Sequence, residues 1–134
     1  MAHRQTRRPI AESVLRRLMA FDDAFLGPHA ATLLVDLRGA ARVGLPLPVI
    51  VLAAALLDVV QHEAAGPAGY LDGAAFVFAG GKADLAWLRG RRNHILHHEG
   101  PSDGLMGEAG ADAWLAGDAE RAITIMLAFL EDLG

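Results

Sequence analysis

One short stretch of the chain, LRGRRNHILHHEG from Leu88 to Gly100, brings together three residue types that act on phosphate esters. Arg92 carries a permanent positive charge on a planar fork that matches phosphate oxygens. His97 follows with four residues between, and histidine is the side chain that most readily accepts and returns a proton at neutral pH. Asn93 can orient either an imidazole or a phosphate. Together these types suit phosphodiester cleavage, with a base for a ribose 2′-hydroxyl and a cation for the charge of the transition state.

This stretch lies at the end of a helix predicted over residues 82–98. At about 100° per residue, one side of the helix carries an apolar stripe that we expect to be buried: Leu85, Leu88, Ile95 and Leu96. Arg92 falls inside the stripe, where it needs a partner or a cleft because its charge is costly to desolvate. The adjacent side has little bulk in its first half and leaves room for another backbone or a second copy of the chain: Ala86, Gly90, Asn93 and His97. Arg92, Asn93 and His97 thus span an arc of about 140° that flanks one groove.

The pattern resembles the signature of HEPN domains, in which an arginine, usually followed by a polar residue, precedes a histidine with four to six residues between them. Here it reads Arg92, Asn93 and His97. The position also matches, near the C-terminal end of the penultimate long helix and before a final amphipathic helix. The detailed resemblance covers the LRGRRNHILHHEG stretch, and the size and helical character of the rest are compatible with it.

The resemblance implies an all-α, antiparallel bundle of four long helices plus one or two short ones that dimerises, so that two arginine–histidine pairs meet in one cleft. Active members of the family are metal-independent ribonucleases, often toxins or defence effectors, and some are paired with a nucleotidyltransferase antitoxin. Other members are non-catalytic modules that bind a nucleotide, RNA or a protein partner. Carried over to this chain, Arg92 would contact phosphate, His97 would be the acid and base, and Asn93 would support them, with no metal and no cofactor.

Structural explanations stand beside this functional one. Arg92 could instead form a salt bridge with Asp84, Glu99 or an acid of the last helix. His97 could simply interact with the negative end of its helix dipole, and the neighbouring His94 and His98 strengthen that explanation.

Three further features have less specific readings. His94 and His98 have a spacing able to hold a metal, with Glu99 or His62-Glu63 as further ligands, but no HExxH pattern is present and a native metal site is the minority reading. Trp87 and Trp114 are expected to pack in the structure rather than to stack on bases. The N-terminal arginines are expected to be solvated, with RNA contact as the lesser alternative.

Periodicity predicts the elements that must position the cluster. Apolar residues at helical spacing predict helices over about 10–26, 28–38, 48–63 and 82–98, with a short one over Tyr70–Ala79. A last helix runs to Leu133 from either Ala111 or Asp118, and Asp118 could cap it, with Glu120 near its positive end. Gly27-Pro28 should end the first helix, and residues 39–47 should form a loop. The almost wholly apolar third helix should be the central one.

Composition sets the class and the setting. The chain has 134 residues, of which 53% are hydrophobic, and no cysteine, which fits a single helical domain over residues 1–134 in a reducing cytoplasm. Residues 1–9 are expected to form a flexible basic N-terminus. The net charge of −4 argues against a protein that coats nucleic acid broadly, although arginines cluster locally. The apolar stretch from Leu45 to Val60 is short for a span and begins with two prolines, so we expect a core helix and no membrane partner.

Overall fold

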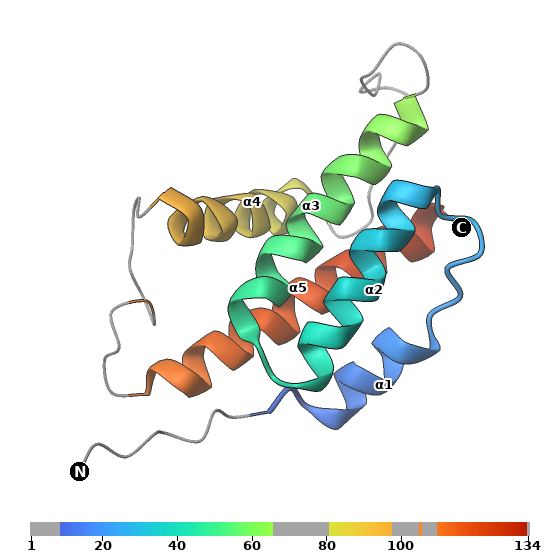
Figure 1. Ribbon diagram of the computed structural model, residues 1–134. Coiled ribbons are helices and arrows are strands. Elements are labelled where there is room, and N and C mark those ends of the chain that lie inside the picture. Colours follow the sequence, from blue (N-terminus) through green and yellow to red (C-terminus); the bar gives the residue numbers. More distant parts are fainter. Residues whose placement is uncertain (1–8, 66–80, 98–104, 106–109, 134) are drawn as a thin grey trace.

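The computed structural model describes residues 9–65, 81–97, 105 and 110–133. Within these ranges the chain forms five helices and no strand (Figure 1). They are α1 (Glu12–Ala20), α2 (Pro28–Arg42), α3 (Pro46–Ala65), α4 (Gly81–His97) and α5 (Ala111–Leu133). The predicted all-α class is therefore confirmed. The short helix expected over Tyr70–Ala79 lies outside the described residues, as does the N-terminal segment apart from Pro9.

The hydrophobic core lies mainly between α3 and its two neighbours α2 and α5, with α1 packed against α2 and α5. α3 is the helix that contacts α2, α4 and α5, so the expectation of a central apolar helix is confirmed (Figure 1). Its residues Pro46–Glu63 are the one stretch of the described chain long and apolar enough to cross a membrane, judged by length and composition alone. The largest fully buried side chains come mostly from these core helices: Phe129, Leu18, Leu34, Leu37, Ile50, Leu56, Leu88, Ile123, Met126, Leu127, Leu130 and Val49.

The turn between α2 and α3 is shorter than the predicted loop over residues 39–47. α2 continues through Gly39 to Arg42, and Gly44 then adopts φ +72°, the left-handed conformation that glycine tolerates. The Gly44 N–H donates to the Ala41 carbonyl at 3.2 Å, and the Leu45 N–H donates to the Ala40 carbonyl at 2.9 Å. This hydrogen-bond pair is a Schellman motif, which ends a helix abruptly and leaves α2 and α3 side by side.

The first helix ends earlier than predicted, at Ala20 rather than near Leu26. The cause is Arg38 of α2, whose guanidinium donates to the carbonyls of Leu18 at 3.1 Å and Phe21 at 2.8 Å and pairs with Asp23 at 2.9 Å. These bonds satisfy carbonyls that a continuing helix would have used. The chain therefore leaves the helix at Phe21, and Phe25, which lies within the predicted helix over residues 10–26, is 49% exposed.

The last helix begins at Ala111, the earlier of its two predicted starts. Asp118 therefore lies two turns inside α5, and its predicted role as an N-cap is wrong. Glu120, two residues further along α5, accepts a hydrogen bond at 2.7 Å from the backbone N–H of Ala11, just before α1. Asp118 and Glu120 are thus both used for contacts with other parts of the chain, Asp118 with Arg91 of α4 and Glu120 with Ala11.

Candidate functional site

α4 carries the candidate residues and lies at an angle to the other long helices, on the side of α3 away from α2 (Figure 1). It contacts α3 and α5. Leu88 is its one fully buried large side chain, while Leu85 and Ile95 are partly buried against the core. Leu96, predicted on the buried stripe, is 54% exposed. The buried face is therefore turned away from Leu96, toward the position of Arg91.

Arg91 is the buried arginine of this helix, with 5% of its side chain exposed. Its Nε donates to Oδ2 of Asp118 at 2.8 Å, which joins α4 to α5. The sequence pattern placed Arg92, not Arg91, in the buried stripe. A pair at this depth is strongly destabilising to break, because it would leave the carboxylate partly buried without its counter-charge.

Arg92 turns to the other neighbour of α4. Its Nη1 lies 2.6 Å from Oδ2 of Asp58 on α3, and the two side chains are 23% and 35% exposed. Of the partners considered from the sequence, Asp84 lies instead 4.0 Å from Arg121, and Glu99 is outside the described residues. The last helix supplies Asp118 to Arg91. A salt bridge of Arg92 was thus foreseen, but its partner was not.

Asn93 lies beside Arg92 as the pattern suggested. Its Oδ1 is 3.4 Å from both Nε and Nη2 of Arg92, a long contact on the side of the guanidinium away from Asp58. His97 is exposed and forms no hydrogen bond or ion pair with any described residue. Asn93 and His97 are one helical turn apart and therefore share a face. Within a single copy of the chain, Arg92 is therefore hydrogen-bonded to Asn93, and neither of these side chains is bonded to His97.

Asp58 also binds a second arginine, Arg89, which lies in the LRGRRNHILHHEG stretch but was not among the candidate residues. Nε of Arg89 lies 3.6 Å from Oδ1 of Asp58, and Nη2 of Arg89 donates to Oε1 of Gln61 at 3.3 Å. His62 lies one turn after Asp58, and its Nδ1 is 2.7 Å from the Asp58 carbonyl. Since a carbonyl only accepts, Nδ1 carries the proton in this contact. The sequence signal that was missed is Asp58 itself: a single acid at the end of an apolar stretch indicates a partner for the arginines of α4.

The described residues contain no group of three or more histidines and acids placed to hold a metal. His98 and Glu99, two of the metal ligands considered from the sequence, lie outside the described residues. Nδ1 of His94 is buried and has no hydrogen-bond partner among the described residues. Trp87 packs as expected: it is partly buried against the core, and the Arg121 guanidinium lies 4.1 Å from the centre of its ring. Trp114, in contrast, is 48% exposed.

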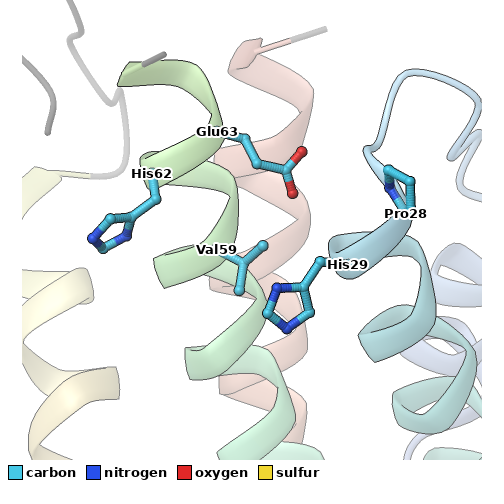
Figure 2. A pocket seen from close by; sticks show the side chains of 5 residues that line it. All are labelled: Pro28, His29, Val59, His62 and Glu63. Carbon is cyan, nitrogen blue, oxygen red and sulfur yellow. The ribbon is translucent and has the colours of Figure 1, made fainter. Parts of the chain in front are cut away.

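A separate hollow lies between the start of α2 and the end of α3, with a volume of about 530 Å³. Val59 and Pro28 give it an apolar floor, and His29 and Glu63 border it (Figure 2). The ring of His62 points away from His29, toward the side of the molecule where α4 lies. The Glu63 carboxylate lies against Gly27, so that a Cβ at that position would collide with it. The carboxylate thereby sits near the positive N-terminal end of α2.

Taken together, the described part of α4 carries two guanidinium groups that face the Asp58 carboxylate, an amide in contact with one of them, and an exposed imidazole one turn beyond the amide. Two cations and one anion leave a net positive charge, a setting that attracts phosphate. Comparison of the chain with protein-family models, with characterised proteins and with solved structures gives no match. The chemistry of this cluster is therefore the basis for a functional assignment.

Proposed function

We propose that this chain is a HEPN-like, metal-independent endoribonuclease that acts in the cytoplasm as a homodimer, in the manner of a toxin or defence effector. Arg92 contacts the scissile phosphate, His97 serves as acid and base, and Asn93 positions them. One observation carries the proposal: the Arg92 guanidinium contacts Asn93, and Asn93 shares its helix face with the exposed His97. Asn93 thus links the Arg92 guanidinium to the helix face that carries His97.

The reaction follows from these groups. The imidazole of His97 accepts the proton of a ribose 2′-hydroxyl, whose oxygen forms a bond to the adjacent phosphorus. The bond from phosphorus to the 5′-oxygen breaks, and a protonated imidazole returns a proton to that oxygen. Arg92 stabilises the charge on the non-bridging oxygens. The products are a 2′,3′-cyclic phosphate and a 5′-hydroxyl, and no water or metal is consumed.

A dimer fits the geometry of α4. Arg92 and His97 are about 140° apart around the helix, so a second copy is needed to close a cleft over both. Ala86 is exposed and a Cβ added at Gly90 would meet nothing within 4 Å, which leaves this face open to the backbone of another chain. The second imidazole in the reaction would then be His97 of the other copy.

A second candidate is a non-catalytic HEPN-like module that binds a nucleotide, RNA or a protein partner such as a nucleotidyltransferase antitoxin. A specific observation favours it. The charge of Arg92 is offset by Asp58 at 2.6 Å, as expected of an arginine that stabilises the packing of α4 on α3. In this case the chain dimerises or captures its partner but turns over no RNA.

RNA cleavage in excess EDTA tests the proposal. The purified chain is compared with His97→Ala and Arg92→Gln, and with His29→Ala and Arg42→Gln as matched controls on α2, which does not contact α4. Loss of a general acid–base residue should slow cleavage about 1000-fold, and the controls should cut at the wild-type rate. A substrate with 2′-deoxyribose at the cleaved position should resist.

The outcomes separate the two candidates. Cleavage that survives EDTA and disappears in both α4 variants, at unchanged melting temperature, establishes the nuclease and its site. Cleavage that persists in His97→Ala removes His97 from the mechanism. A wild-type chain that cuts no RNA, with or without divalent metal, eliminates the nuclease and leaves the binding module.

A further inference from the structure

One carboxylate lies between two arginines where α4 meets α3. Oδ2 of Asp58 is 2.6 Å from Nη1 of Arg92, and Oδ1 is 3.6 Å from Nε of Arg89. Each oxygen of the carboxylate thus faces a different guanidinium. Arg89 and Arg92 are three residues apart and so lie on the same side of α4.

The two arginines are not held equally. Arg92 is 23% exposed and has the short contact with Asp58. Arg89 is 49% exposed, and its polar contacts with described residues, to Asp58 at 3.6 Å and to Gln61 at 3.3 Å, are both longer. Ion pairs with this much exposure to solvent contribute little free energy, so exchanging one anion for another costs little. Arg89 is therefore free to follow an incoming anion.

A phosphate group can take the place that the carboxylate holds. Its non-bridging oxygens offer an arginine fork the same kind of acceptor as a carboxylate does. A phosphodiester carries the same charge as one carboxylate, and a terminal phosphate carries more. The cluster of Arg89, Arg92 and Asp58 has one positive charge in excess. An anion added there is attracted rather than repelled.

We propose that Arg89 and Arg92 form a two-arginine phosphate clamp in which Asp58 is an internal counter-ion that the phosphate displaces. The clamp rests on the proposed function for its location and extends it: Arg89 becomes a second phosphate contact, and Asp58 sets the affinity by competing. Asp58 holds the two guanidinium groups extended before substrate arrives and weakens binding of any phosphate that must replace it.

The experiment measures binding without cleavage. A fluorescent, fully 2′-O-methylated RNA oligonucleotide is titrated with the full chain by anisotropy across a range of salt concentrations. Asp58→Asn keeps the size of the side chain and one acceptor oxygen for Arg92, and should tighten binding about fivefold, because a competing charge is removed. Arg89→Gln should weaken binding and lower the slope of log affinity against log salt by about 0.7.

Matched controls remove the effect of net charge. Asp36→Asn and Arg42→Gln make the same charge changes at exposed positions of α2 and should stay within about twofold of wild type. If Asp58→Asn binds no tighter than Asp36→Asn, or Arg89→Gln no weaker than Arg42→Gln, the clamp is wrong. Because the RNA is uncleavable, these results do not depend on nuclease activity: an inactive protein with both expected shifts keeps the clamp and loses the nuclease.

A second arm identifies the source of the phosphate. Inorganic phosphate is titrated while the side-chain Nε–H signals of the arginines are followed by NMR. Shifts confined to Arg89 and Arg92, and larger in Asp58→Asn, indicate a site that takes free phosphate as well as the RNA backbone. If phosphate shifts neither arginine signal but the variants change RNA binding as expected, the clamp is restricted to the RNA backbone. If neither the NMR shifts nor the expected changes in RNA binding occur, the clamp is overturned.

Discussion

The helices of this protein are joined in two different ways. α2 and α5 each pack on α3 through fully buried apolar side chains, whereas α4 has Leu88 alone at that depth, adds partly buried apolar side chains, and is also held by ion pairs. Two adjacent arginines on α4 face different helices, with Arg91 paired to Asp118 on α5 and Arg92 to Asp58 on α3. The helix that carries the candidate chemistry thus combines a single fully buried apolar side chain with ion pairs to both of its neighbours.

The difference teaches how one helix serves both packing and chemistry. Apolar contact stabilises without fixing direction, whereas a charged pair fixes which residue meets which. The buried Arg91–Asp118 pair sets the rotation of α4. That rotation leaves the next residue, Arg92, at the boundary with solvent, where its pair with Asp58 is accessible to another anion.

The largest expected effect compares two leucines that are both fully buried. Leu34→Ala in the core between α2 and α3 should lower the free energy of unfolding by about 4 kcal/mol, because rigid neighbours on all sides leave a cavity. Leu88→Ala on α4 should cost about 2.5 kcal/mol, since a helix with few apolar contacts can shift to fill the space. Urea denaturation measures both. Equal losses would show that α4 is anchored as firmly as the core.

The next effect concerns the two arginines. Arg91→Met should lower the free energy of unfolding by about 3 kcal/mol, because it leaves Asp118 without its cation in a largely buried place. Arg92→Met, one residue on, should cost at most about 1 kcal/mol because its pair is partly solvated. Adding Asp118→Leu to Arg91→Met should restore most of the loss. Similar costs at the two positions would contradict the division between a packing arginine and an accessible one.

The smallest effect is expected for an exposed ion pair outside α4. Arg17 and Glu131 join α1 to α5 at 3.5 Å, and both side chains are at least half-exposed. Glu131→Gln should therefore change the free energy of unfolding by less than about 0.5 kcal/mol. Thermal melting at low and high salt checks it. A larger loss would mean that ion pairs contribute to the core region too.

Much of the fold could be predicted from local pattern, because helical periodicity is recorded within each segment. Five predicted helices have counterparts near the expected residues, and α3 is central as its composition required. The ends were harder. The end of α1 depends on Arg38, a residue of the next helix, and no pattern within the first segment indicates it. The short turn at Gly44 shows that Gly39 alone does not end a helix.

The candidate site was predicted in its residues but not in its connections. Residue types and spacing selected Arg92, Asn93 and His97, and the structure joins the first two. The partner of Arg92, Asp58, lies 34 positions earlier on α3. A helical wheel describes one helix at a time and cannot show how α3 and α4 cross. A wheel also places adjacent arginines about 100° apart without saying which one faces the core. Only the packing of α4 between Asp58 and Asp118 decides that.

The carboxylate of Glu63 that lies against Gly27 has a consequence for how the molecule opens. It places a charge from the last turns of α3 at the first turn of α2, so that the two helix ends share one electrostatic contact although they are distant in the chain. Fraying of either end exposes the other. Amide hydrogens at the start of α2 and the end of α3 should therefore exchange as a single cooperative unit, distinct from the opposite ends that meet at Gly44.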